Sequence, residues 1–84
     1  MLHIILNGAK LETKEAMHDY LAKMLHLPEY YGRNLDALHD CLTDIGEETE
    51  LILLNWDAFD HTKRVMNVIV DAARENSNLK ITAK

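Results

Sequence analysis

Three aspartates at a spacing of four residues are the first side chains in this sequence whose types and positions could do chemistry: Asp36, Asp40 and Asp44. On a helix, residues four apart are neighbours on one face, and like charges so placed repel by about 0.2 to 0.5 kcal/mol per pair. The stretch from Asn34 to Glu50 contains six acidic residues and no lysine or arginine. We therefore expect the counter-charge to come from another molecule, although acidic runs are often no more than a solvated face.

Catalytic and metal-binding uses of these residues find little support in the spacing. A small enzyme using Asp36, His39 and Asp40 would need a cleft that separates the pKa values of its carboxylates, and a small sheet offers little room for one. His39 and Asp40 are adjacent, so they do not converge on one metal ion, and the calcium-loop pattern of acids around a central glycine is absent. Cys41 could form a nucleophile pair with a histidine, but its place near an apolar stripe favours a buried structural thiol.

Known cofactor motifs are also absent from the chain. There is no phosphate-binding loop, no glycine-rich dinucleotide motif, no metalloprotease HExxH and no paired CxxC. We therefore expect no enzyme activity, no cofactor and no metal site.

The composition predicts a small soluble globular protein with a basic partner. With 84 residues, 48% of them hydrophobic and 27% charged, the chain is expected to form one domain over residues 1–84. The net charge of −5 argues against direct binding to nucleic acid or an anionic membrane and favours a basic protein. No apolar run approaches the roughly 18 to 20 residues of a membrane span. Because no export signal is visible and a single cysteine cannot form an internal disulfide, we expect a cytoplasmic location.

Hydrophobic patterning predicts the order β-α-α-β-α-β. Helical connections between strands imply a parallel sheet with right-handed crossovers, and the most continuous apolar run is expected to be its central strand, covered on both faces. The strand order is then 1-2-3. Predicted strands cover 2–6, 51–56 and 79–83, and predicted helices run from Thr13 to just before Pro28, from Asn34 to a stop at Gly46, and from Thr62 to near Asn76.

The loop before the second predicted helix carries two adjacent tyrosines, Tyr30 and Tyr31. Tyrosine is enriched at protein interfaces, but a tyrosine at a loop–helix junction can equally fill the core. We expect one of the two to point inward and the other outward. Gly32 is free to adopt a positive φ, Asn34 can cap the helix, and Asp57 can cap a later turn that includes Phe59.

The stretch LPEYYGRNLDALHDCLT, residues 27–43, closely resembles the corresponding part of the barstar family, intracellular inhibitors of the bacterial ribonuclease barnase. The motif is long and specific, and similarity extends over the whole chain. The resemblance implies an α/β domain with a three-stranded parallel sheet and three to four helices. The segment after Trp56 is shorter than in the family, which predicts one helix and a turn there instead of two helices.

The resemblance also implies an inhibitory surface on the second helix and the loop before it. In the family this surface blocks the nuclease active site, with the carboxylate at the position of Asp40 standing where a substrate phosphate lies. The partner would be a basic, extracellular-type microbial ribonuclease of the guanyl-specific kind, bound in a one-to-one complex. Carried over position by position, the binding residues would be Tyr30, Gly32, Asn34, Asp36, His39, Asp40, Thr43, Asp44 and the peripheral Glu75.

Three residues depart from the family pattern. His39 and Ile45 stand where the family has tryptophan, and Asp44 stands where it has glycine. The resemblance therefore implies a nuclease related to barnase with a more basic or differently shaped rim. The alternative is a binding or regulatory protein of the same fold whose basic partner is not a nuclease.

Overall fold

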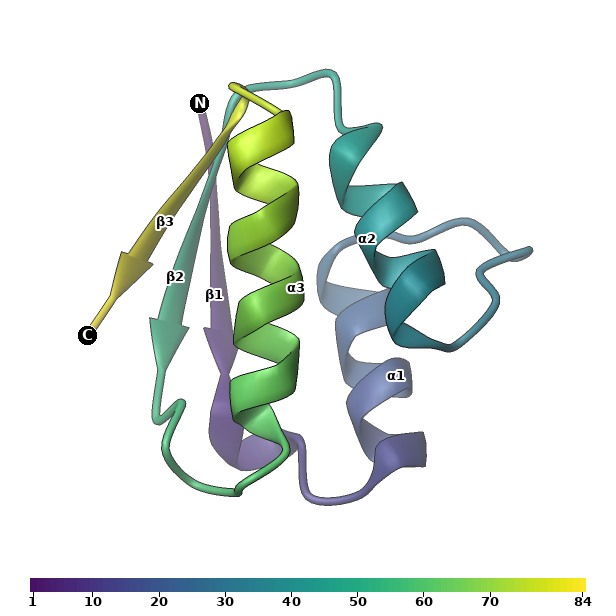
Figure 1. Ribbon diagram of the computed structural model, residues 1–84, viewed down its shortest axis with the longest axis vertical. Coiled ribbons are helices and arrows are strands. Elements are labelled where there is room, and N and C mark those ends of the chain that lie inside the picture. Colours follow the sequence, from purple (N-terminus) through teal and green to yellow (C-terminus); the bar gives the residue numbers. More distant parts are fainter.

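The computed structural model describes residues 1–84 and contains three strands and three α-helices (Figure 1). Strand β1 (Leu2–Asn7) leads through a short 3-10 turn (Gly8–Lys10) into helix α1 (Lys14–Met24), and helix α2 (Leu35–Thr43) follows. Strand β2 (Thr49–Leu54), helix α3 (Thr62–Glu75) and strand β3 (Leu79–Ala83) complete the chain. The predicted element order is confirmed, with one helix and a turn after Trp56.

All three strands are parallel and lie in the order β1-β2-β3, as predicted. Leu51 at the middle of β2 pairs with Ile4 of β1 on one side and with Ile81 of β3 on the other. Helix α1 contacts β1, α3 contacts β3, and α2 packs mainly on α3. Helix α2 is therefore held at the outside of the helical layer, where one of its faces stays open to solvent.

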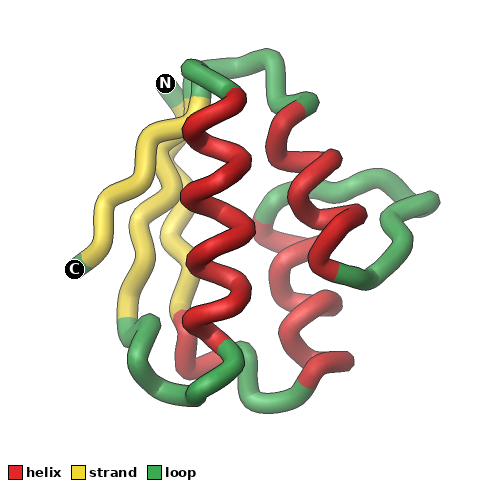
Figure 2. The backbone as a smooth tube through the Cα atoms, in the orientation of Figure 1, coloured by secondary structure: helices red, strands yellow, loops and turns green.

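The helices cover only one face of the sheet, as the backbone trace shows (Figure 2). Leu51 and Leu53 of β2 are completely buried beneath them, whereas Ile52 and Leu54 on the opposite face are only half-buried, and Ile5 of β1 is exposed. The prediction that both faces of the central strand are covered is therefore wrong. A continuous apolar run indicates that the strand lies inside the sheet. Which face of the sheet is covered depends on where the three helices pack.

The turn into α3 is closed by a hydroxyl group. The Thr62 side chain donates hydrogen bonds to the carbonyl groups of Phe59, at 2.6 Å, and of Trp56. The predicted cap residue Asp57 is exposed and makes no hydrogen bond to this turn. The prediction that Asp57 caps this turn is wrong: β2 ends at Leu54 instead of Trp56, and the Thr62 hydroxyl makes the hydrogen bonds that close the turn. The predicted cap of α1 is confirmed, since the hydroxyl of Thr13 accepts a hydrogen bond from a first-turn N–H.

Gly8 allows the end of β1 to approach the end of β2. A Cβ atom at this position would overlap the carbonyl oxygen of Asn55 and would lie 3.0 Å from the Cα of Trp56. The backbone there has no room to move, because both strands belong to the same sheet. A side chain at residue 8 is therefore incompatible with this connection.

Candidate functional site

Asn34 shapes the junction between the loop and α2. Its side-chain oxygen accepts a hydrogen bond from the N–H of Ala37 at 2.8 Å, and its amide nitrogen donates to the carbonyl of Gly32 at 3.2 Å. The predicted cap is therefore confirmed. Because both ends of the amide are already engaged, Asn34 sets the direction in which α2 leaves the loop.

Arg33, and not Gly32, takes the left-handed conformation just before α2, with φ of 54°; His26, earlier in the same loop, has φ of 52°. The prediction of a positive φ at Gly32 is wrong. The guanidinium of Arg33 forms an ion pair with Asp19 at 2.7 Å and donates to the carbonyl of Glu15 at 3.3 Å, both on α1. These tertiary contacts help to hold a conformation that sequence preference alone would assign to the glycine.

The two tyrosines divide as predicted, one inward and one outward. Tyr31 is only 8% exposed, and its hydroxyl lies 2.7 Å from the Nδ1 atom of the buried His18. Burial raises the pKa of Tyr31 to about 12, so its hydroxyl stays protonated. Tyr30 is 87% exposed. Tyr31 thus anchors the loop to α1, while Tyr30 presents a large aromatic ring to solvent.

Helix α2 presents an acidic face. Leu38 and Leu42 are completely buried and attach the helix to the rest of the protein, while Asp36, Asp40 and Asp44 are exposed. The Asp40 side chain is 84% exposed, and none of the three aspartates forms an ion pair with lysine or arginine. Their mutual repulsion is therefore not relieved by any fixed cation of this chain.

The end of α2 differs from the prediction. The helix stops at Thr43, and Asp44 is its C-terminal cap, so the expected stop at Gly46 is too late. A carboxylate is unfavourable at this end of the helix dipole. The hydroxyl of Thr43 donates to the carbonyl of Asp40 at 2.9 Å. Its hydrogen is therefore used inside the helix and is not presented to a partner.

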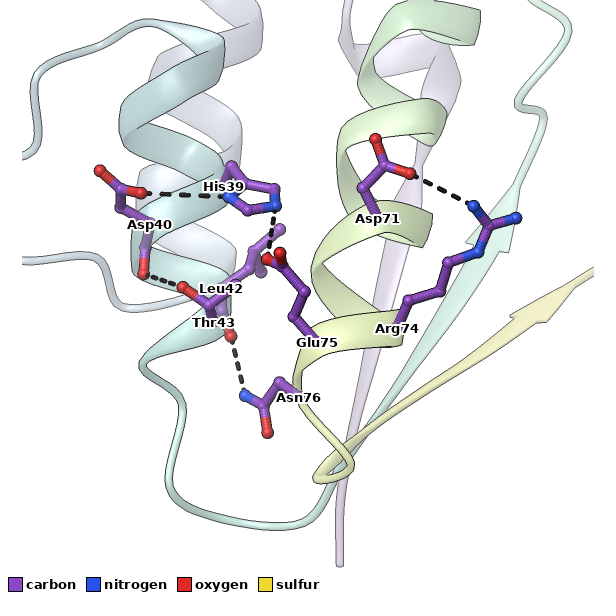
Figure 3. Close-up of polar contacts among 8 residues, drawn as sticks. All are labelled: His39, Asp40, Leu42, Thr43, Asp71, Arg74, Glu75 and Asn76. Atoms are coloured by element: carbon purple, nitrogen blue, oxygen red, sulfur yellow. Dashed lines mark hydrogen bonds and ion pairs between the residues drawn. The ribbon is translucent and has the colours of Figure 1, made fainter.

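His39 links α2 to the last turn of α3 (Figure 3). Its Nε2 atom lies 3.1 Å from a carboxylate oxygen of Glu75, and its Nδ1 atom lies 3.9 Å from a carboxylate oxygen of Asp40. Arg74, although next to Glu75 in sequence, points away and contacts Asp71 at 3.6 Å. The tertiary structure thus brings Glu75 beside the acidic face, as its assignment to the predicted surface requires.

Asn76 joins the C-terminal ends of α2 and α3 and was not singled out from the sequence. It is 8% exposed, and its amide nitrogen donates to the carbonyls of Leu42 at 3.0 Å and Ile45 at 2.9 Å. Its side-chain oxygen accepts from the N–H of Asn78 at 3.0 Å. An asparagine after a helix resembles any loop residue in the sequence, so no local signal distinguishes it.

A shallow groove of about 160 Å³ separates the loop from α2. Tyr30 and Asp44 line it together with Pro28, Cys41 and Ile45. Burial, and then the nearby acidic side chains, raise the pKa of the Cys41 thiol. A raised pKa disfavours the thiolate that a nucleophile requires. No three histidine, cysteine, aspartate or glutamate side chains converge as a metal site would require.

Two comparisons with known proteins identify the family. The family model described as "Barstar (barnase inhibitor)" matches residues 1–82. A curated relative from Bacillus subtilis (strain 168), named "Putative ribonuclease inhibitor YrdF", is 42% identical, and the alignment covers 89% of each chain. This chain belongs to the barstar family.

Membership agrees with the architecture, since the family resemblance implied a three-stranded parallel sheet, and the strand order 1-2-3 predicted from the apolar run is the order observed. As a barstar-family protein, the chain is an inhibitor of the barnase type of ribonuclease and not an enzyme. None of the three α-helices combines the length and the hydropathy of a membrane-spanning segment.

Proposed function

We propose that this barstar-family chain inhibits its ribonuclease by covering the active site with α2 and the preceding loop. The observation that carries the proposal is the row of exposed aspartates on α2, which lacks any fixed cation of its own chain. A ribonuclease active site concentrates positive charge because it binds a polyanion. An acidic helix complements such a site and accelerates association with it.

Asp40 is the central residue of the proposed interface. Its carboxylate projects from the middle of α2 and would occupy the place of a substrate phosphate among the basic side chains of the nuclease. Leu38 and Leu42, on the opposite side of the helix, are completely buried. The carboxylate is therefore presented on a helix anchored by its inner face, which lowers the entropic cost of binding.

The remaining residues form the surroundings of Asp40. We assign Asp36 and Glu75 to ion pairs at the rim, and the exposed ring of Tyr30 to an apolar contact. Gly32 and Asn34 shape the loop, and Thr43 closes the last turn of α2. These assignments place a continuous surface on α2, the loop and the end of α3.

His39 and Asp44 are the residues that we expect to govern the choice of nuclease. His39 already contacts Glu75, so a partner must accept a polar pair where the family offers an aromatic ring. Asp44 adds a negative charge beside the groove lined by Tyr30. Both changes favour a nuclease with a more basic rim than barnase.

Titration of a panel of small microbial ribonucleases tests this proposal. Wild-type protein should abolish the activity of its target at a one-to-one molar ratio. Asp40→Ala should weaken binding by about 2 to 5 kcal/mol, the general cost of removing one partner of a buried, hydrogen-bonded charge pair. The barnase–barstar complex is itself one of the examples from which this range is taken. This corresponds to a rise in Kd of about 30-fold to several thousand-fold.

Glu47→Ala is the matched control, because Glu47 is an exposed acid beyond the end of α2. An exposed rim charge contributes about 0 to 1 kcal/mol, so this variant should inhibit nearly as well as wild type. Equal losses in the two folded variants would contradict the central role of Asp40. A folded protein that inhibits no member of the panel would favour the alternative of a basic partner that is not a nuclease.

Two further assignments belong to this proposal. We propose that residues 1–84 act as one domain, and that the protein works in the cytoplasm. There it would neutralise a nuclease that the cell makes for export.

A further inference from the structure

A cavity lies at the N-terminal ends of the helices, away from the acidic face of α2. It measures about 380 Å³ and is lined by residues of all three helices. A volume of this size is typical of pockets that hold small molecules. Asn34 is the one residue that this cavity shares with the proposed inhibitory surface.

The cavity is rich in unpaired positive charge. Lys14 of α1 and Arg64 of α3 line it, and neither forms an ion pair with an acidic residue of the chain. One carboxylate, that of Glu12, also lines the cavity. Two exposed cations and one exposed anion thus line this cavity, in a protein whose net charge is −5. The local balance of charge is therefore opposite in sign to that of the whole protein.

A buried histidine supplies a hydrogen-bond donor to the same cavity. His18 is only 2% exposed and lines the cavity, and its Nδ1 atom is paired with the Tyr31 hydroxyl. That hydroxyl has no other acceptor, so its hydrogen is assigned to the bond with Nδ1. Burial, then Arg33 and Lys14, lower the pKa of His18, so the ring is neutral and carries its hydrogen on Nε2. Nε2 makes no hydrogen bond within the protein.

The direction of the helices adds to the positive charge of the cavity. All three helices run opposite to the strands, so their N-terminal ends point to the same side of the molecule (Figure 1). The first residues of α1 and α2, Lys14 and Leu35, line the cavity, and their backbone N–H groups have no acceptor within the helices. The positive ends of the helix dipoles therefore reinforce the charge of the side chains.

We propose that this cavity binds a small molecule that carries a phosphate or carboxylate group. Arg64 and Lys14 would hold the anionic group, and the Nε2–H of His18 would donate a hydrogen bond to it. Met17, Leu35 and Val65 also line the cavity and would contact an apolar portion of the ligand. Phosphate and carboxylate are both negatively charged hydrogen-bond acceptors. The proposed ligand is therefore a small molecule that has one such group and an apolar portion.

The test is a titration followed by NMR, with phenyl phosphate and benzoate as separate probes and sodium chloride of equal ionic strength as reference. Either probe should produce saturable shifts at the amides of Lys14 and Leu35 and at the ring of His18. The probe that binds more tightly identifies the anionic group. Arg64→Ala should weaken binding about tenfold or more, because a hydrogen bond to a charged group is lost.

Lys63→Ala is the matched control, since Lys63 is an exposed cation next to Arg64 but does not line the cavity. This variant should bind the probe as wild type does. The proposal is overturned if neither probe gives saturable shifts, or if Arg64→Ala and Lys63→Ala bind equally well while both remain folded. The experiment contains no nuclease, so its result is independent of the inhibitory function.

Discussion

Replacement of Asn76 by alanine should loosen the contact between α2 and α3. The wild-type side chain makes three hydrogen bonds within an almost fully buried site: to the carbonyl of Leu42 in the last turn of α2, to the carbonyl of Ile45 just beyond it, and to the N–H of Asn78. Each bond contributes about 0.5 to 1.5 kcal/mol net. The two carbonyls each keep another donor, since that of Leu42 accepts from the N–H of Ile45 and that of Ile45 from the Asn78 side chain, so the loss is that of the three bonds themselves. We therefore expect a loss of about 2 to 4 kcal/mol in the free energy of unfolding.

This loss is large for a protein of this size. At about 0.05 to 0.15 kcal/mol per residue, the total stability of an 84-residue chain is about 4 to 13 kcal/mol. Urea unfolding followed by circular dichroism measures the change directly, and the thermal midpoint should fall by about 10 °C or more. Amide hydrogen exchange should also become faster at the C-terminal end of α2, because the Asn76 amide that donates to the carbonyls there is lost and this end of the helix opens more readily.

Two variants make the reasoning refutable. Ser77→Ala changes the next residue, which is exposed and makes no side-chain hydrogen bond, and should stay within about 0.5 kcal/mol of wild type. Asn76→Asp keeps the acceptor but places a negative charge against two carbonyl oxygens, so it should be no more stable than Asn76→Ala. If Asn76→Ala unfolds at the same urea concentration as Ser77→Ala, the side chain does not hold α2 and the reasoning fails.

Two further predictions concern the backbone and the buried histidine. Gly8→Ala should lower the free energy of unfolding by more than about 2 kcal/mol, because its methyl group would overlap the Asn55 carbonyl. Gly46→Ala, with open space around it, should be nearly neutral. Similar urea midpoints for the two variants would refute the steric argument. Because the pKa of His18 is lowered by folding, the unfolded chain binds more protons as the pH falls through about 6.5, so stability should decrease there. In urea unfolding at about pH 7.5 and 5.5, this decrease should be smaller in His18→Gln, and an unchanged decrease would contradict the assignment.

Much of the fold was predictable because its signals are local. Thr13 and Asn34 precede apolar stripes of helical period, and each caps its helix as predicted. Helical connections between apolar strands required a parallel sheet, and the sheet order followed from the most apolar run being central. The caps depend on residues close together in the chain, and the sheet order on the position of the most apolar run, so the sequence alone predicts both.

The acidic row on α2 was also predictable, since a four-residue spacing needs only helical geometry to align its side chains. The unequal burial of Tyr30 and Tyr31 was anticipated, but which of the two points inward was not. That choice depends on His18 of α1, which offers a hydrogen-bond partner to Tyr31 alone. The roles of these residues toward a nuclease remain predictions.

Contacts between distant residues decided the rest. Arg33 takes the left-handed conformation expected of Gly32 while its guanidinium binds α1, and His39 meets Glu75 only because α2 packs on α3. The hydrogen bonds by which Asn76 joins α2 to α3, and the cavity lined by all three helices, also depend on contacts between residues far apart in the chain. Local preferences amount to tenths of a kcal/mol to about one kcal/mol per residue, so a few tertiary hydrogen bonds and ion pairs are enough to override them.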